Sequence, residues 1–525
     1  MPPTVRSALP GSVDVCVIGS GPSGVIAAAV LAQSGQRVLL LEEGTAPQAG
    51  DSLASMEPGW EPALAWNKGG GLAAVGRPWS ACGLGGGMSV FAGLAFRFRH
   101  VDFDAAAYAG AGAMDPSWPI RYPDLRPYYD EIERAIGVAR LAGSDPVEPE
   151  AMLPRMPPHP YSAAGGLLAD AGFRLGMRPF PTPLAINPVA YRGRPACHRC
   201  GPCNEYVCPT GAKANAAGLF LGPLLRAGSL ALRTESRALR VVLAGSHRAA
   251  GIEWLDLHTR QRHLTRARVI VVAANAVQSA AILLRSACRQ APRGLGNHGD
   301  MLGRGLSFKV SKYLSGTVQY LKQAARPGGP HSTVSFTDHY LDPAAPTGLG
   351  GLIYEASPQD RTVRGRRVRL RLHCLAADQP MPANRVLLGP GTAANGAPGL
   401  VMDYRTHRVD AARLKYLTCQ ARRILREAGA ADITEEPSGY QLGSRHLHGT
   451  CRAGTDPRAS VTDPWGLVHG TDNVYVVDGG FFPYAGGVNP VLTIQANALR
   501  ISAEIARRLG TPRTGALAPE LTPAN

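Results

Sequence analysis

Apolar and polar positions follow two different patterns along this chain. Near its start, residues 13–18 (VDVCVI) form a short apolar run with β-branched side chains, which predicts a buried strand. Residues 25–33, rich in alanine and leucine, predict a helix, and residues 37–41 (RVLLL) predict a second strand. Strand, helix and strand in this order predict a βαβ unit of a parallel sheet.

The second pattern lies in the middle of the chain. Apolar and polar residues alternate in three stretches, 310–320, 349–354 and 368–375. This alternation predicts an antiparallel sheet between about residues 306 and 443. Residues 410–427 predict a helix, and residues 268–273 (RVIVVA) predict a further buried strand.

These elements predict an α/β nucleotide-binding domain that is assembled from discontinuous segments, together with an α+β domain built on the antiparallel sheet. The expected boundaries are 10–130, 190–305 and 444–510 for the first domain, and 131–189 and 306–443 for the second. Residues 511–525, with Pro, Thr and Gly, predict a disordered tail.

A glycine-rich loop connects the first strand to the first helix. Gly19 allows the tight turn, Gly21 lets a pyrophosphate approach the backbone, and Gly24 lets helix and strand pack closely. Glu42, at the end of the second strand, is placed to accept hydrogen bonds from ribose hydroxyls. The loop therefore predicts dinucleotide binding, although this pattern alone does not separate FAD from NAD.

Length and composition set the outer limits. A chain of 525 residues that is 45% hydrophobic can bury a sizeable core in about two domains. No apolar run reaches the roughly 18 residues of a membrane span, and residues 1–12 lack the pattern of a signal peptide. We therefore expect a cytoplasmic enzyme with no membrane partner.

The formal net charge of +16 raises the question of nucleic acid as a partner. Arg367, Arg369 and Arg371 alternate with apolar residues, so all three share one face of a strand, as a solvated face or as a patch that steers an anion. No nucleic-acid-binding motif accompanies them. A basic nucleotide-binding or nucleic-acid-binding protein without catalysis is the alternative class, and we do not expect nucleic acid.

Candidate catalytic residues occur near the end of the chain. Histidine can exchange a proton near neutral pH, and an alcohol oxidation needs one group to take the hydroxyl proton and another to hold the oxygen. His446 and Asn489 are the candidates for this pair. His448 lies on the same face of an extended segment as His446, so spacing alone leaves both histidines open.

Taken together, these blocks resemble the glucose–methanol–choline (GMC) family of FAD-dependent oxidoreductases. Besides the glycine loop with Glu42 and the two C-terminal blocks, the resemblance rests on residues 85–89 (GGGMS), 102–104 (DFD), 118–120 (WPI), 128–129 (YY), 296–297 (GN), 377–380 (ADQP) and 384–386 (NRV). It covers about residues 13–507, nearly the whole chain.

The resemblance implies the GMC fold, with FAD as cofactor, His446 as the catalytic base and Asn489 as the second catalytic residue. Besides Gly19, Gly21, Gly24 and Glu42, it implies cofactor contacts at Gly86, Gly87, Met88, Ser89, Ala238, Asp478, Gly479, Asn489 and Pro490. Some related sugar oxidases tether flavin through a histidine just after the Met-Ser pair. Residues 90–92 (VFA) contain no histidine, so we expect non-covalent FAD.

Several longer strings resemble the paromamine 6′-oxidase group of this family: 180–187, 338–342, 350–355 and 446–454. That resemblance implies oxidation of a primary aminosugar hydroxyl to an aldehyde, with oxygen or another electron acceptor and a downstream aminotransferase. A different sugar or a sterol alcohol is the alternative substrate. Because a +16 protein repels a polycation, we expect local negative charge in the pocket, from Asp338 and Glu355, with His448 as a further substrate contact.

Six of the ten cysteines are scattered, and the other four form a cluster within 12 residues, at Cys197, Cys200, Cys203 and Cys208. The spacing comes close to a ferredoxin-like run, with one extra residue before the last cysteine, and four thiolates can also bind zinc. The resemblance implies no cluster, so we favour free thiols or one local disulfide and expect no metal.

Overall fold

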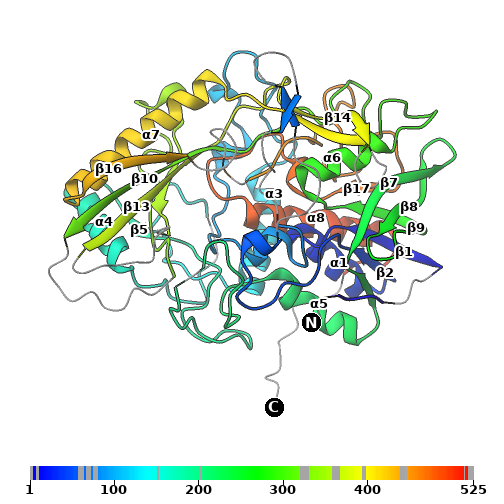
Figure 1. Cartoon of the computed structure of the whole chain (residues 1–525), viewed down its shortest axis with the longest axis horizontal. Helices are drawn as coiled ribbons and strands as arrows, with labels where there is room; N and C mark the ends of the chain where they lie inside the picture. The colour runs from blue at the N-terminus through cyan, green and yellow to red at the C-terminus, as the bar shows by residue number, and fades with distance from the viewer. Residues whose placement is uncertain are drawn as a thin grey trace.

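The computed structural model describes residues 4–7, 11–56, 64–66, 72–74, 81–150, 153–201, 203–319, 330–357, 367–392, 398–437, 444, 446–513 and 515–517. Two large sheets lie at opposite ends of the molecule, with α3 (Tyr122–Ile136) and α8 (Val491–Arg508) between them (Figure 1).

The first sheet has seven strands in the order β6-β2-β1-β9-β8-β7, with β17 also paired to β9. Its strands are β1 (Ser12–Ile18), β2 (Val38–Leu41), β6 (Leu230–Arg233), β7 (Ser236–Ala244), β8 (Arg248–Asp256), β9 (Arg262–Val272) and β17 (Val474–Val476). β1, β2, β6, β9 and β17 pair in parallel, whereas β7 and β8 form an antiparallel extension. The sheet thus combines segments from the beginning, middle and end of the chain.

Helices cover both faces of this sheet. α1 (Pro22–Gln33) is buried over most of its length because it packs between one face of the sheet and the helices α5 (Ala216–Arg226) and α8. α6 (Asn275–Arg285) packs against the other face. The βαβ unit predicted from residues 13–41 is confirmed, since β1 and β2 pair in parallel around α1.

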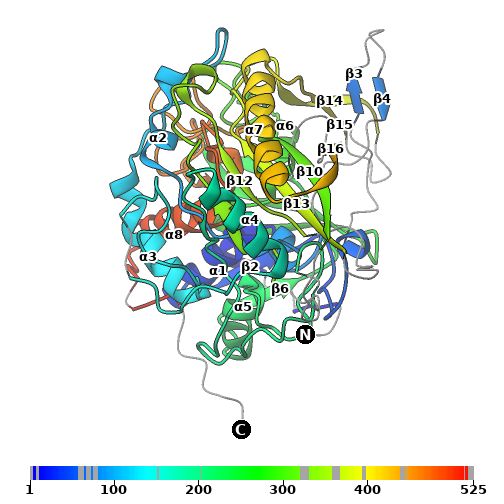
Figure 2. The same ribbon diagram turned by 90° about the vertical axis from the view of Figure 1, so that its left-hand side faces the viewer.

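The second sheet has the order β16-β10-β13-β12-β11-β5, and its neighbouring strands are antiparallel, as predicted. Its strands are β5 (Phe180–Pro181), β10 (Val310–Gln319), β11 (Val334–Phe336), β12 (Leu352–Glu355), β13 (Arg367–Ala376) and β16 (Ala431–Pro437). α4 (Ala163–Arg174) and α7 (Arg408–Glu427) lie across its outer face (Figure 2). The inner face is thereby left to face the rest of the molecule.

A third sheet, of four strands, was not predicted. It has the order β14-β15-β3-β4, from β14 (Arg385–Thr392), β15 (Pro398–Asp403), β3 (Leu64–Trp66) and β4 (Leu72–Ala74). The remaining short elements are α2 (His100–Phe103) and the 3₁₀ helices η1 (Leu53–Met56), η2 (Gly86–Ser89), η3 (Ala106–Tyr108), η4 (Pro346–Gly348) and η5 (Gly479–Phe481). The domain boundaries given above stay a prediction.

The described residues after α8 contact α1 and α3. Leu517 is fully buried, its amide donates to Glu131 (2.8 Å), and its carbonyl accepts from the Gln33 side chain (2.9 Å). Arg513 forms an ion pair with the same glutamate. Burial of Leu517 and these polar contacts anchor residues 511–513 and 515–517, whereas residues 514 and 518–525 lie outside the described residues. The disordered tail stays a prediction.

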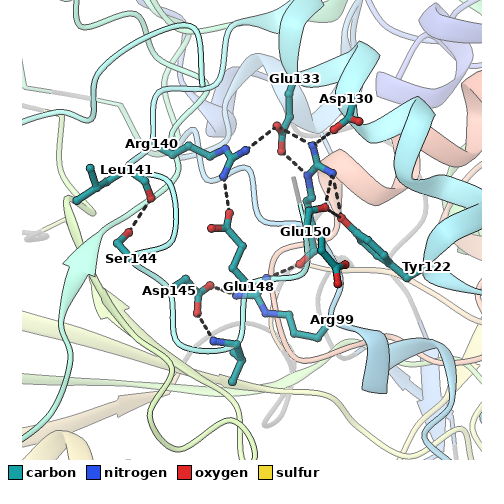
Figure 3. A network of polar contacts seen from close by, with 12 residues as sticks. Arg99, Tyr122, Asp130, Glu133, Arg140, Leu141, Ser144, Asp145, Glu148 and Glu150 are labelled. Atoms are coloured by element: carbon teal, nitrogen blue, oxygen red, sulfur yellow. Dashed lines mark hydrogen bonds and ion pairs between the residues drawn. The ribbon is translucent and has the colours of Figure 1, made fainter. Parts of the chain in front are cut away.

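Several arginine side chains carry their positive charge inside the molecule. Arg97, Arg99 and Arg140 have nearly buried side chains in a network of ion pairs on and beside α3 (Figure 3). Their carboxylate partners are Asp130 (2.6 Å) and Glu133 (2.7 Å) for Arg97, Glu148 (2.7 Å) for Arg140, and Asp145 for Arg99. Asp145 also accepts from Thr337 (2.6 Å), so the network ties this region to the second sheet.

The arginines predicted to share a strand face do so on β13, but two of the three are not free to steer an anion. Arg369 and Arg371 both pair with Glu436 on β16, at 2.9 Å each.

Among the described residues, no helix is long and apolar enough to cross a bilayer.

Candidate active site

A cavity of about 310 Å³ lies between the carboxyl ends of the parallel strands and the inner face of the second sheet. Predicted site residues that line it are Gly19, Gly21, Glu42, Gly86, Gly87, Met88, Ala238, His446, Asp478, Gly479, Asn489 and Pro490. Gly24, Ser89, His448, Asp338 and Glu355 do not line it. The sequence therefore identified most of the residues around one shared site.

The glycine loop forms one end of the cavity. Gly19 has φ +91°, and a Cβ atom added to Gly24 would lie 1.9 Å from the Gly19 carbonyl oxygen, so both positions require glycine. A Cβ added to Gly21 would meet nothing within 4 Å. Gly21 is also the N-cap of α1 and makes no side-chain cap, so the helix presents free N–H groups to the cavity. This cradle fits a pyrophosphate.

Glu42 follows β2 and is nearly buried at the same end. Its carboxylate accepts from the Ser20 amide (2.9 Å), the Ser20 hydroxyl (2.5 Å) and the Gly44 amide (2.8 Å). Two carboxylate oxygens offer about four acceptor positions, so one position is left for a ribose hydroxyl. The residue thus fits the predicted contact with a dinucleotide.

The segment 85–89 closes over the glycine loop. A Cβ atom on Gly86 would lie 2.9 Å from the Gly21 Cα, so the two loops approach closely because both are glycine. Met88 lines the cavity, whereas Ser89 is buried behind it and donates to the Leu84 carbonyl (3.0 Å). Ser89 therefore supports the loop in this structure instead of facing the cavity.

Asp478 lines the cavity beside Gly479. It is buried and accepts from the Ser279 hydroxyl (2.5 Å) and the Gly480 amide (2.8 Å). Burial raises the pKa of Asp478 to about 6, and these hydrogen bonds oppose the rise. The hydrogen bonds fix the direction of the carboxylate at the cavity wall.

His446 and Asn489 meet in the same cavity. The Asn489 amide nitrogen lies 3.4 Å from His446 Nε2, and the Ser444 hydroxyl lies 2.6 Å from His446 Nδ1. Ser444 donates its single proton to the Phe308 carbonyl (2.5 Å), so toward His446 it accepts. Nδ1 therefore carries the proton, and Nε2 presents a lone pair, as a general base requires.

His448 is placed differently. Its side chain is fully buried, stacks on Phe482 (5.4 Å between ring centroids) and does not line the cavity. Burial lowers the pKa of His448 well below its usual value, and the positive charge of Lys309 lowers it further. Of the two histidines, the structure brings only His446 to the cavity, so the expected substrate contact at His448 is not supported.

The two acids expected to bind ammonium groups also lie elsewhere. Glu355 is buried on the helix-facing side of the second sheet, where it accepts from the Ser162 and Thr333 hydroxyls (2.5 and 2.6 Å). Asp338 accepts from the Arg178 amide (3.0 Å) and pairs with its guanidinium (3.5 Å). Both oxygens of Glu355 have hydrogen-bond partners, whereas Asp338 Oδ2 has none among the described residues. Neither acid lines the cavity, and their role in binding ammonium groups stays a prediction.

Three side chains that sequence reasoning missed line the cavity from the second sheet. Tyr313, His373 and Tyr354 lie directly opposite one another on β10, β13 and β12. The rings of Tyr313 and His373 stack at 4.1 Å, and the Tyr354 hydroxyl lies 2.5 Å from His373 Nδ1. Strand alternation could have placed each on one face, but only the pairing register shows that they form a row.

The cysteine cluster contains free thiols at Cys197, Cys200, Cys203 and Cys208. Within the described ranges, no three His, Cys, Asp or Glu side chains are grouped so that they could hold a metal ion. The expectation of no metal stays a prediction.

Comparisons with known proteins agree with this site. Profiles described as GMC oxidoreductase match residues 181–310 and 380–498, and one described as FAD binding domain matches residues 12–49. The chain belongs to the GMC oxidoreductase family and is an FAD-dependent oxidoreductase that acts on alcohols. The predicted family, cofactor and enzyme class are confirmed, and the non-catalytic alternative is wrong.

Individual relatives cover almost the whole chain. It is 47% identical to 6‴-hydroxyparomomycin C oxidase from Streptomyces lividus and 45% identical to paromamine 6′-oxidase from Streptomyces fradiae, in each case over 95% of this chain and 92% of the relative. The fold also matches the crystal structure of pyridoxine 4-oxidase from Mesorbium loti, with a TM-score of 0.67, 19% identity, and coverage of 94% of this chain and 99% of that one.

Proposed function

We propose that this enzyme oxidises a primary hydroxyl of an aminosugar to the aldehyde, with the 6′-hydroxyl of paromamine or a related pseudodisaccharide as substrate. The observation that carries the proposal is the His446–Asn489 pair, which lies in the same cavity as the FAD cradle. The two Streptomyces relatives, whose names refer to paromamine and a hydroxyparomomycin, support this substrate class.

The chemistry follows from the two side chains. His446 Nε2 accepts the proton of the substrate hydroxyl, while the Asn489 amide donates a hydrogen bond to the same oxygen and holds it in place. When bound, FAD accepts the hydride that leaves the carbinol carbon. α8 begins at Val491 without a side-chain cap, so its positive end favours negative charge in the cavity.

The second sheet provides the wall on which the sugar would lie. Arg371 stands 3.8 Å from the Tyr313 ring centroid and pairs with Glu436, so the row of Tyr313, His373 and Tyr354 is held rigidly. Aromatic side chains with a few fixed polar groups are typical of small-molecule sites. The edges and hydroxyls of this row suit a ring that carries many hydroxyl groups.

The chemistry of the product indicates which class of enzyme would act next. An aldehyde at a former carbinol carbon is the form that an aminotransferase converts to an amine, so we propose an aminotransferase as the downstream enzyme. Molecular oxygen or another electron acceptor must reoxidise the cofactor. A cytoplasmic location stays a prediction, as does non-covalent binding of FAD.

The decisive experiment is anaerobic bleaching of the flavin in the purified enzyme. Paromamine is expected to bleach it rapidly, because its 6′-carbinol is the group proposed to react at His446, whereas glucose and cholesterol are expected to bleach it slowly or not at all. The measurement is flavin absorbance after rapid mixing with each alcohol. Equal rates with glucose or cholesterol would contradict the aminosugar assignment but leave the oxidation of alcohols intact.

Ser444 provides a test of the assigned tautomer. Ser444→Ala removes the acceptor for His446 Nδ1–H, and we expect flavin reduction to slow roughly tenfold, the effect of about 1.4 kcal/mol. The lost hydrogen bond also stabilised the imidazolium, so the acid limb of the kcat/KM profile should move to lower pH. Ser444→Thr keeps a hydroxyl and serves as the control. If the acid limb of the kcat/KM profile of Ser444→Ala stayed at the wild-type pH, the assignment of the proton to His446 Nδ1 would be contradicted.

A further inference from the structure

Lys309 is a fully buried lysine next to the catalytic pair. It lies immediately before β10, and its ammonium group donates to the main-chain carbonyls of Ala485, Gly486 (2.9 Å) and Val488 (2.5 Å). The three N–H donors of an ammonium group are thus matched by three carbonyls of a single loop. This loop leads directly to Asn489.

Keeping the Lys309 ammonium group charged at this buried position is energetically unfavourable. Burial lowers the pKa of Lys309 to about 7, and the carboxylates of Asp102 and Asp378 oppose that effect. Lys309 also has φ +59°, a left-handed conformation that side chains other than glycine seldom adopt. A buried ammonium in a strained backbone position persists only where the surrounding structure holds it firmly.

The same segment also holds the histidine. The Lys309 carbonyl accepts from the Ser444 amide (2.5 Å), and the Phe308 carbonyl accepts from the Ser444 hydroxyl. Ser444 in turn accepts from His446 Nδ1. Residues 308–309 are therefore linked to both catalytic residues. The Lys309 side chain binds the loop that precedes Asn489, and the backbone of residues 308–309 binds Ser444, which in turn binds His446.

We propose that Lys309 is a positioning residue, which sets the placement of Asn489 relative to His446 by holding the carbonyls of residues 485–488. The inference rests on the catalytic roles given above for these two residues. It does not depend on which alcohol the enzyme prefers, because the contacts lie behind the pair and not in the substrate wall.

The chain contains a matched control. Lys213 is also buried and donates to three main-chain carbonyls, those of Phe91, Cys203 and Tyr206, each at 2.7 Å. Burial lowers the pKa of Lys213 to about 8. None of its three acceptors belongs to the His446 or Asn489 segments, so Lys213→Met reproduces the loss of a buried ammonium without touching the catalytic pair.

The test compares Lys309→Met, Lys309→Gln and Lys213→Met as FAD-loaded full-length enzymes. The first readout is hydrogen exchange of the peptide covering residues 484–490, expected to accelerate at least about tenfold in Lys309→Met and less in Lys309→Gln, whose amide keeps two donors. The second is the anaerobic rate of flavin reduction by whichever alcohol bleaches the wild type fastest, expected to fall about two- to tenfold in Lys309→Met, as for loss of the Asn489 amide itself, with KM nearly unchanged.

Each outcome is decisive. Wild-type exchange in residues 484–490, or a wild-type reduction rate, in both Lys309 variants overturns the inference. A loss of rate in Lys213→Met as large as in Lys309→Met also overturns it, since the effect would then be general destabilisation. Failure of paromamine to bleach the wild type would instead reject the aminosugar assignment and leave the comparison of variants valid with another alcohol.

Discussion

His446→Ala is expected to slow the reduction of the flavin by substrate roughly 10²–10⁴-fold, the usual contribution of a general base. The reason is that His446 is the residue whose Nε2 lone pair faces the cavity next to Asn489, while Ser444 keeps the proton on Nδ1. FAD should remain bound, because the glycine loop, Glu42 and Asp478 do not depend on this imidazole.

The measurement is anaerobic rapid mixing of the flavin-loaded variant with paromamine, together with the flavin content of the purified protein. Asn489→Ala is the comparison, expected to lose only the roughly 0.5–1.5 kcal/mol of one neutral hydrogen bond, which is about a two- to tenfold change in rate. Rapid bleaching of His446→Ala would remove it from the role of base, and loss of FAD would assign it to cofactor binding instead.

Gly24→Ala is expected to abolish FAD binding and to destabilise the fold. The added methyl group would lie 1.9 Å from the Gly19 carbonyl oxygen and 3.1 Å from the Ala273 Cβ. The oxygen belongs to the backbone of the turn, so α1 must move away from β1, at a cost of about 1–3 kcal/mol or more. Flavin content and the thermal unfolding midpoint measure the two effects.

Gly21→Ala is the matched control in the same loop. Its methyl group would meet nothing within 4 Å, so the apoprotein should unfold at the wild-type temperature. The methyl would nevertheless occupy space at the N-terminus of α1, where the pyrophosphate is expected, so FAD affinity should fall. If the Gly24→Ala protein retained its flavin on purification and had the wild-type thermal unfolding midpoint, close packing of helix and strand would not be needed here.

Local patterns predicted the main elements well. The strand–helix–strand unit of residues 13–41 and the helix ending at Glu427 could be read from short windows, because each carries its own apolar periodicity. The third sheet could not be predicted, since β3 pairs with β15 across more than 300 residues and spans only three residues itself. Such pairing depends on tertiary contacts that no window of sequence contains.

At the active site, too, some residues could be inferred from the sequence, whereas others depend on tertiary contacts. Gly19, Gly24 and Glu42 act through their immediate neighbours, so their roles could be inferred. Glu355 does not line the cavity because alternation along β12 turns it toward α4 while Tyr354 faces the cavity, and the direction of that alternation cannot be read from the sequence. Lys309 and Ser444 carry no motif, and only the folded backbone brings them to the catalytic pair.

The composition of the first sheet has a consequence for synthesis of the protein. β1 and α1 are synthesised well before β17 and α8, which pair with β9 and pack on α1 respectively. The nascent chain must therefore carry the part of α1 that packs on α8 uncovered until α8 has been made. Asn489 and the start of α8 line the cavity, so the cofactor can be fully enclosed only after these residues have been synthesised.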